Sequence, residues 1–254
     1  GESNIFAPPE QDYDTIPYKN GVYKGYISNG LPNGTGELDL PNGEKYIGSF
    51  ADGEFNGPGI YRYLDGSSYD GMWFEGAIHG YGTLTFADNS YIYANFVDGE
   101  PQGSCVYQNA NGDIYEGELK DGKRTGNGRF LWTNGDKYEG NYVDGEREGQ
   151  GKYTYANGNS YEGEWIASVP NGVGVMITNG VKYEGVFVQG ILEGEGVSTN
   201  KNGDTYKGYF VGGKCNDEKA VYTFKDGSKY EGPFVNDLFN GKGKFTYADG
   251  DIVQ

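Results

Sequence analysis

Residues able to do acid-base, nucleophilic or metal chemistry are few and scattered in this sequence. His79 is the single histidine, and no carboxylate or cysteine pattern surrounds it, so we expect neither a general base nor a metal ligand there. Cys105 and Cys215 lack Cys-x-x-Cys spacing and predict neither a zinc site nor a disulfide framework. The Gly-x-Gly elements lack the strand-to-helix context of a nucleotide loop. We therefore expect no catalytic residue, no metal, no cofactor and no enzymatic activity.

Aromatic rings are the abundant binding groups, with 24 Tyr, 13 Phe and 3 Trp. They recur in a pattern of about 23 residues, Tyr-x-Gly-x-aromatic-x-x-Gly-x-x-x-Gly-x-Gly, and ten copies run from Tyr23 to the C-terminus. A unit this short cannot bury its own apolar face, so the units must stack in an array. The tyrosines that open the clearest copies are Tyr46, Tyr69, Tyr115, Tyr138, Tyr161, Tyr183, Tyr206 and Tyr230.

Each unit is typical of a β-hairpin. Alternation places Tyr115, Gly117 and Leu119 on one face and Glu116 and Glu118 on the other, as in a half-buried strand. Glycine recurs too often for a helix, since each interior glycine costs roughly 1 kcal/mol relative to alanine. Strands therefore position the rings.

Two different turns connect these strands. Asp121-Gly122 predicts a two-residue type I′ turn, because both residues tolerate a positive φ. The period is odd, so the second connection must differ by one residue to keep the rings on one face. Thr133-Asn134-Gly135 predicts a three-residue loop with a left-handed last residue, which sets Phe130 opposite Tyr138. In Ala87-Asp88-Asn89, asparagine takes that last position. Counting from the first turn predicts the pairs Leu119 with Arg124, Gly117 with Gly126, and Tyr115 with Gly128.

The predicted fold is all-β: an elongated single-layer antiparallel β-meander of about ten hairpins, twisted into a trough with its aromatic face inside. Residues 1–20, which include Pro8, Pro9 and Pro17, are expected to form a linker or an irregular cap, and residues 21–254 the repeat array. Indels in the seventh and ninth copies predict a bend, bulge or gap near residues 177–180 and 213–227.

The aromatic face supports two interpretations. The first is structural, because these rings are the only available core. The second is an interaction groove, because a single layer cannot cover its own apolar face. The expected core rings are Tyr46, Tyr69, Trp73, Tyr115, Tyr138, Tyr161, Trp165, Tyr183, Tyr206 and Tyr230. The second-strand rings vary more between copies and are the candidate partner-binding groove: Tyr61, Tyr63, Phe86, Tyr107, Phe130, Trp132, Tyr153 and Tyr155.

Charge narrows the classes of partner. A formal net charge of -17 disfavours nucleic acid and anionic lipid, both of which reward clustered Lys and Arg, and favours a basic partner. A row of glutamates is expected on the outer face, where a solvated surface is the simpler interpretation and a basic segment the alternative. The row contains Glu116, Glu118, Glu139, Glu162, Glu164 and Glu184.

The units Tyr115-Glu-Gly-Glu-Leu-Lys-Asp-Gly and Tyr161-Glu-Gly-Glu-Trp, each followed by Gly-x-Gly, closely resemble the MORN (membrane occupation and recognition nexus) repeat. Three copies depart from the pattern: Ile92 replaces a tyrosine, Ser168 replaces a turn glycine, and Asp217 stands in a glycine position. The resemblance implies a non-enzymatic scaffold that binds a partner protein or peptide at cytoskeletal, ciliary or membrane-associated structures in the cytoplasm.

Three alternatives stay open. A carbohydrate- or phospholipid-binding repeat module would also use exposed rings, although sugar-binding repeats of this kind rely on tryptophan. The array could be the targeting module of a larger enzyme. Its open edge strands could also support self-association.

Overall fold

The computed structural model describes residues 11–254, and all of their regular structure is β-strand. No helix in this described part is long and apolar enough to cross a membrane. The chain divides into two units after Lys123, and each is described by itself. Residues 1–10, which belong to the predicted linker or cap, lie outside the described residues.

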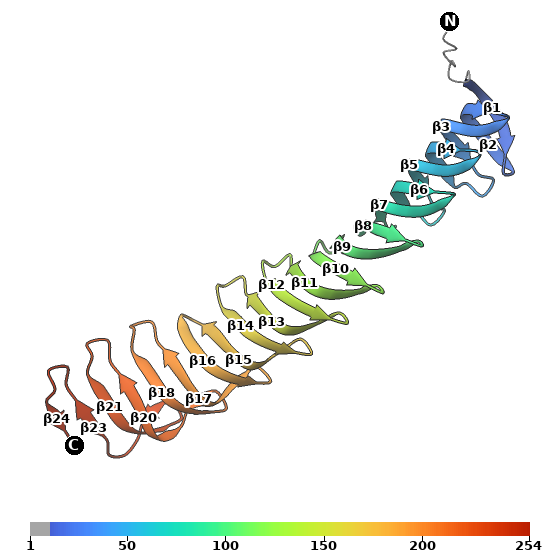
Figure 1. The fold of residues 1–254 in the computed structure, drawn as a ribbon. Coiled ribbons are helices and arrows are strands. Elements are labelled where there is room, and N and C mark those ends of the chain that lie inside the picture. Colours follow the sequence, from blue (N-terminus) through green and yellow to red (C-terminus); the bar gives the residue numbers. More distant parts are fainter. Residues whose placement is uncertain (1–10) are drawn as a thin grey trace, which may run out of the picture. The chain divides into compact units, whose positions relative to one another are not determined.

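Unit 1 is an antiparallel meander in which each strand pairs with the one before it (Figure 1). Its strands are β1 Asp12–Tyr18, β2 Gly21–Ser28, β3 Leu31–Asp39, β4 Lys45–Ala51, β5 Glu54–Arg62, β6 Ser68–Phe74, β7 Ala77–Thr85, β8 Tyr91–Val97, β9 Glu100–Gln108 and β10 Ile114–Lys120.

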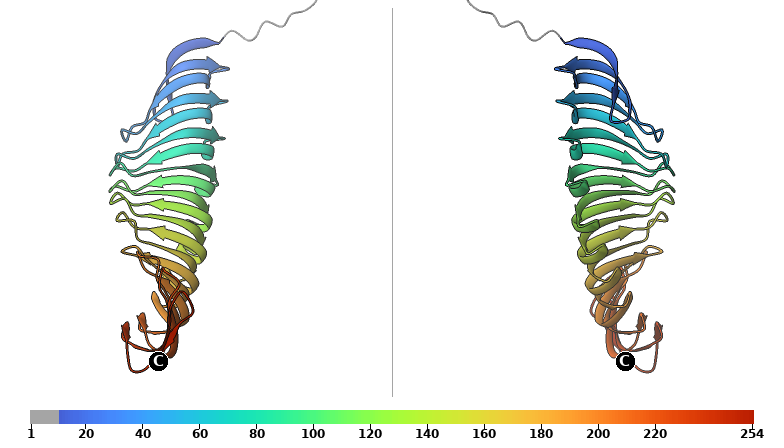
Figure 2. Two further views of the ribbon diagram at one scale, coloured as in Figure 1. Left: turned by 90° about the vertical axis from the view of Figure 1, so that its left-hand side faces the viewer. Right: turned by 90° about the vertical axis from the view of Figure 1, so that its right-hand side faces the viewer.

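Unit 2 continues the same pattern, with shorter strands toward its end. Its strands are β11 Lys123–Leu131, β12 Lys137–Val143, β13 Glu146–Thr154, β14 Ser160–Ile166, β15 Val169–Thr178, β16 Val181–Val188, β17 Ile191–Thr199, β18 Thr205–Val211, β19 Lys214–Cys215, β20 Asp217–Thr223, β21 Lys229–Val235, β22 Leu238–Phe239, β23 Lys244–Thr246 and β24 Ile252–Val253. In each unit the strands form one layer, and no other segment of residues 11–254 packs over it (Figure 2), which confirms the predicted single-layer meander.

The N-terminal strand requires a correction to the predicted linker or cap. Asp12–Tyr18 is a regular strand, and all seven of its residues pair with β2. Pro17 is compatible with this strand because β1 pairs on one side only and Pro17 with Val22 is the pair after Tyr18 with Gly21, which flanks the turn. At such a non-hydrogen-bonded pair the N–H that proline lacks would point away from β2.

Both predicted turn types are confirmed. Asp121 and Gly122 have φ values of 51° and 74°, as a type I′ turn requires. Gly135 ends its loop at φ 95°, and Asn89 takes the same place at φ 67°. Phe130 pairs with Tyr138 as the three-residue loop predicted.

The predicted glycine register is wrong by two residues. In the Tyr138 repeat the pair next to the turn, Tyr142 with Arg147, matches the predicted pattern, but a bulge then intervenes and Gly140 pairs with Gly151. The same shift occurs between β2 and β3, β4 and β5, β6 and β7, β14 and β15, and β16 and β17. The bulge brings Gly151 under the tyrosine ring, where a Cβ would lie only 2.3 Å from the Tyr138 Oη.

The opening tyrosines make one recurring hydrogen bond. The Tyr138 hydroxyl donates to the Asn141 carbonyl at 2.9 Å, and the equivalent bond to the residue three positions on forms in the repeats opened by Tyr23, Tyr46, Tyr69, Tyr115, Tyr161, Tyr206 and Tyr230. Because burial disfavours the phenolate, the pKa of Tyr161 rises to about 12. The repeat is therefore held by a buried neutral phenol over a glycine.

The two predicted irregularities have different outcomes. Near residues 177–180 the prediction is wrong, because Asn179-Gly180 forms a two-residue turn that absorbs the missing residue. Met176 pairs with both Tyr161 and Tyr183, so the rings stay on one face. Within residues 213–227 the prediction is confirmed, since β18 pairs first with the short β19 and then with β20, and the register of β20 shifts between Asp217 and Ala220.

Candidate functional site

Rings assigned to the repeat core from the sequence differ in burial. Tyr183 and Tyr230 are half-buried. The other eight are buried: Tyr46, Tyr69, Trp73, Tyr115, Tyr138, Tyr161, Trp165 and Tyr206. Edge-to-face contacts join neighbouring repeats, as in Tyr138 with Trp165 at 5.4 Å and Tyr161 with Phe187 at 5.1 Å between ring centroids. These rings are largely occupied by contacts within the sheet.

The candidate groove rings are more accessible. In unit 1, Tyr61 and Tyr63 contact each other at 4.6 Å, Phe86 is 41% exposed, and Tyr107 is half-buried opposite Tyr115. Tyr61 also contacts Trp73 at 5.9 Å.

In unit 2 the structure brings the four candidate rings together. Phe130 and Trp132 contact each other at 4.4 Å, and Tyr153 and Tyr155 at 4.6 Å. Trp132 and Tyr153 join these two ring pairs at 5.2 Å between centroids. Tyr155 is 47% exposed. A continuous aromatic surface therefore crosses from one repeat to the next within this unit.

A carboxylate lies behind several second-strand tyrosines. Asp136 accepts a hydrogen bond from the Tyr153 hydroxyl at 2.8 Å and another from the Ala156 N–H at 2.8 Å. The pKa of Asp136 is lowered chiefly by the Ala156 N–H and then by the Tyr153 hydroxyl. Glu44 with Tyr61 and Asp204 with Tyr222 repeat the arrangement. Each carboxylate thus fixes a ring in the following repeat.

Two guanidinium groups stack on the aromatic face of unit 2. The Arg147 guanidinium carbon lies 4.7 Å from the Trp165 ring centroid and 5.3 Å from that of Tyr153, and Arg147 donates a hydrogen bond to the Ser168 carbonyl at 2.8 Å. Arg124 lies 5.5 Å from the Phe130 centroid and donates to the Gly145 carbonyl at 2.9 Å. Cation–π contacts of this kind fix each arginine against the rings.

A pocket of about 400 Å³ opens on this surface, and we call it the unit-2 pocket. Three of the eight candidate groove residues line it, together with buried Trp165 and with Arg147. The full lining is Trp132, Arg147, Tyr153, Tyr155, Trp165, Ser168, Val169 and Pro170. Its walls come from three successive repeats, so it exists only because the repeats are stacked.

Sequence reasoning missed the contribution of the second residue after each two-residue turn. Arg147 and Pro170 occupy this position, and each pairs across the hairpin with a buried ring, Tyr142 or Trp165. In unit 1 the equivalent Phe55 stacks on Tyr46 at 3.8 Å. The signal was available, because the predicted pairing of Leu119 with Arg124 already placed this position on the aromatic face.

The outer face of unit 2 is a ladder of mixed charge. Arg129 pairs with Glu139, Glu139 with Lys152, and Lys152 with Glu162 across successive strands. Lys152 and Glu162 form an ion pair at 3.2 Å, and Lys182 and Glu184 another at 2.8 Å. Of the predicted glutamates, Glu139, Glu162 and Glu184 thus lie beside cations, as in a solvated face that resists stacking against another sheet.

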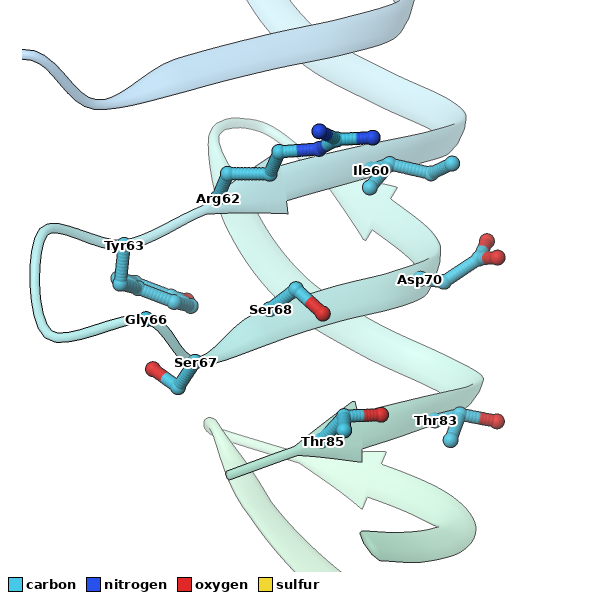
Figure 3. A pocket seen from close by; sticks show the side chains of 9 residues that line it. All are labelled: Ile60, Arg62, Tyr63, Gly66, Ser67, Ser68, Asp70, Thr83 and Thr85. Atoms are coloured by element: carbon cyan, nitrogen blue, oxygen red, sulfur yellow. The ribbon is translucent and has the colours of Figure 1, made fainter. Parts of the chain in front are cut away.

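Unit 1 carries a polar pocket of about 670 Å³ on its outer face. Figure 3 shows two rows of side chains across β5, β6 and β7: Arg62, Ser68 and Thr85, and Ile60, Asp70 and Thr83. On the same face Tyr81, 56% exposed, stacks on Tyr93 at 6.0 Å. None of these residues was predicted from the sequence to be functional, although Tyr63, one of the candidate groove rings, also lines this pocket.

Comparison with known proteins agrees with this repeat geometry. A model described as "MORN repeat" matches nine segments: residues 23–45, 46–68, 69–91, 94–114, 115–137, 138–160, 161–180, 183–205 and 230–252. It omits the irregular ninth copy, which contains Asp217, and shortens the copies that contain Ile92 and Ser168.

Solved structures show only distant similarity. The TCP domain of SAS-4 (dCPAP) of Drosophila melanogaster, in complex with a proline-rich motif of Ana2 (dSTIL), is 18% identical with a TM-score of 0.40, over 68% of this chain and 87% of that one. The wild-type TCP10 domain of Danio rerio CPAP is 10% identical with a TM-score of 0.24, over 95% and 98%. No curated protein matches the chain in sequence. The family model covers most of the sequence, and the chain belongs to the MORN-repeat family.

Proposed function

We propose that this chain is a non-catalytic MORN-repeat scaffold that binds a partner protein or peptide through the aromatic surface of unit 2. The observation that carries the proposal is the unit-2 pocket, where half-buried Trp132 and exposed Tyr155 stand beside buried Trp165. Tyr and Trp dominate the binding energy of protein interfaces, and a partly open pocket backed by a rigid core gives them a fixed geometry.

The proposed setting is cytoplasmic, at cytoskeletal or ciliary structures or at the periphery of a membrane. Protein partners fit the charge better than lipids do. The net charge of -17 opposes an anionic bilayer surface, whereas a partner that covers the rings needs no overall positive charge on the chain.

Proximity labelling in cells can test the proposal with three forms of the intact chain. The wild type, the double variant Trp132→Ala with Tyr155→Ala, and the matched control Tyr209→Ala would be compared. Tyr209 is 51% exposed and lies on the outer face of unit 2, opposite Glu195. We expect the double variant to lose specific partners that the control keeps. Identical partner sets for all three forms would refute the proposal.

A further inference from the structure

We infer that the unit-2 pocket takes an extended proline-rich segment with two prolines three residues apart and basic residues beside them. The inference rests on the proposed function and names the chemistry of its partner. Three features of unit 2 support it: the spacing of the ring pairs, their number, and the charge around the pocket.

The spacing of the rings matches a polyproline II helix. Trp132 and Tyr155 hold the same position, just before the three-residue loop, in adjacent repeats. Equivalent positions in adjacent repeats lie two strands apart, or about 9.6 Å. A polyproline II helix rises about 9.3 Å per turn of three residues. A segment that crosses the strands therefore presents the same face to both ring pairs, whereas two turns of an α-helix rise about 10.8 Å and overshoot.

The number of ring pairs in unit 2 determines how many prolines the partner segment presents. Phe130 with Trp132 forms the first ring pair, and Tyr153 with Tyr155 the second. The next repeat has Met176 and Thr178 at the equivalent positions, so the aromatic strip ends there. Two ring pairs accommodate two prolines, because aromatic-lined grooves take the pyrrolidine rings of a preformed extended helix.

The charge around the pocket favours a basic segment. Glu146 contacts the Ser168 hydroxyl, Glu148 accepts the Ala167 N–H at 3.0 Å, and Asp136 accepts the Tyr153 hydroxyl. Within residues 11–254 none of these three carboxylates forms an ion pair. Arg147 is the single cation of the lining, and it already stacks on Trp165. Three carboxylates against the two guanidinium groups of Arg147 and Arg124 leave a net acidic rim for lysine or arginine beside the prolines.

Fluorescence anisotropy with the intact chain can test the inference. The probe is a short labelled peptide with prolines three residues apart and two flanking arginines. The first control peptide has the same composition with prolines two residues apart, the second carries glutamates in place of arginines, and the third is a basic helix-forming peptide. We expect the probe to bind at least about tenfold more tightly than each control, with affinity falling as salt increases.

Three variants connect that binding to the pocket. Tyr155→Ala should weaken the probe about tenfold, because an exposed ring can be removed without unfolding the sheet. Glu148→Gln should weaken it less and reduce its salt dependence. Tyr209→Ala should leave it unchanged, and thermal melts would verify that all three variants fold.

Selection from a random peptide library on the intact chain separates failure of this inference from failure of the proposed function. Binders that depend on Tyr155 but lack spaced prolines, such as helical peptides, would overturn the inference and keep the function. Absence of any binder that depends on Tyr155 would overturn both. Enrichment of prolines three residues apart beside Lys or Arg supports both.

Discussion

The ring of Tyr138 lies against Gly151 so closely that a Cβ on this glycine would fall 2.3 Å from the phenolic oxygen and 2.6 Å from two ring carbons. The same relationship joins Tyr46 with Gly59 and Tyr69 with Gly82. In each of these repeats a tyrosine ring thus packs directly on a glycine of the neighbouring strand. This ring–glycine contact fixes the strands that position the unit-2 pocket.

Gly151→Ala should destabilise unit 2 by about 3 kcal/mol, because the buried ring cannot move aside and the overpacking must displace a strand. Gly158→Ala is the matched control, since its Cβ would meet open space and would add only the strain of a left-handed backbone at φ 89°, about 1 kcal/mol. Urea unfolding followed by tryptophan fluorescence would measure both. Equal destabilisation by the two substitutions would contradict the claim that the contact of Tyr138 with Gly151 requires glycine.

Tyr138→Phe should cost about 1 kcal/mol, because it keeps the ring but removes the hydrogen bond to the Asn141 carbonyl. Tyr155→Phe serves as the control, since Tyr155 is exposed and its hydroxyl donates no hydrogen bond in the described structure. Thermal unfolding of both variants would measure the difference. A loss no larger than that of the control would mean that the hydrogen bond contributes nothing.

Turn chemistry explains why so much of the fold could be predicted from the sequence. Asp121-Gly122 and Gly135 encode their positive φ values locally, and alternation assigns each side chain to a face. With a short repeat, these local rules lead directly to a meander. The loop register, such as Phe130 opposite Tyr138, follows from the same local information.

The bulge and the pocket could not be predicted because they depend on contacts between distant residues. The register shift between Gly140 and Tyr142 places Gly151 under the ring of Tyr138. The residues of the turn do not encode this contact, so counting from the turn could not predict it. The unit-2 pocket needs Trp132, Arg147 and Pro170, which belong to three different repeats. Arg147 was overlooked because the residue type at its position varies between repeats. The predicted pairing of Leu119 with Arg124 had nevertheless placed that position on the aromatic face.

Acid should loosen the contacts between repeats at the loop edge. The folded pKa of Asp136 lies below its unfolded value of about 3.9, so its contribution to stability is complete above that pH and is lost as pH falls through the folded pKa. Asp204 is lowered chiefly by the Lys225 N–H, and Glu44 by the Tyr61 hydroxyl.

We therefore expect thermal stability to fall steeply below about pH 4. Asp136→Asn should make that fall shallower while lowering stability at neutral pH. Melting temperatures recorded from neutral to acidic pH would measure both effects. A variant whose acid dependence parallels that of the wild type would show that this carboxylate is not linked to folding.

Arg147→Met should destabilise unit 2 by about 1 to 2 kcal/mol, because methionine keeps an apolar stem but loses the charge stacked on Trp165 and the bond to the Ser168 carbonyl. Lys152→Met is the matched control, because it removes a cation whose ion pair with Glu162 is exposed, and such pairs contribute little. Urea unfolding would compare the two variants. Arg147→Met should also change the emission of Trp165, which the guanidinium covers, whereas Lys152→Met should not. Equal stability losses with unchanged emission would show that the contact between the Arg147 guanidinium and the rings does not stabilise the fold.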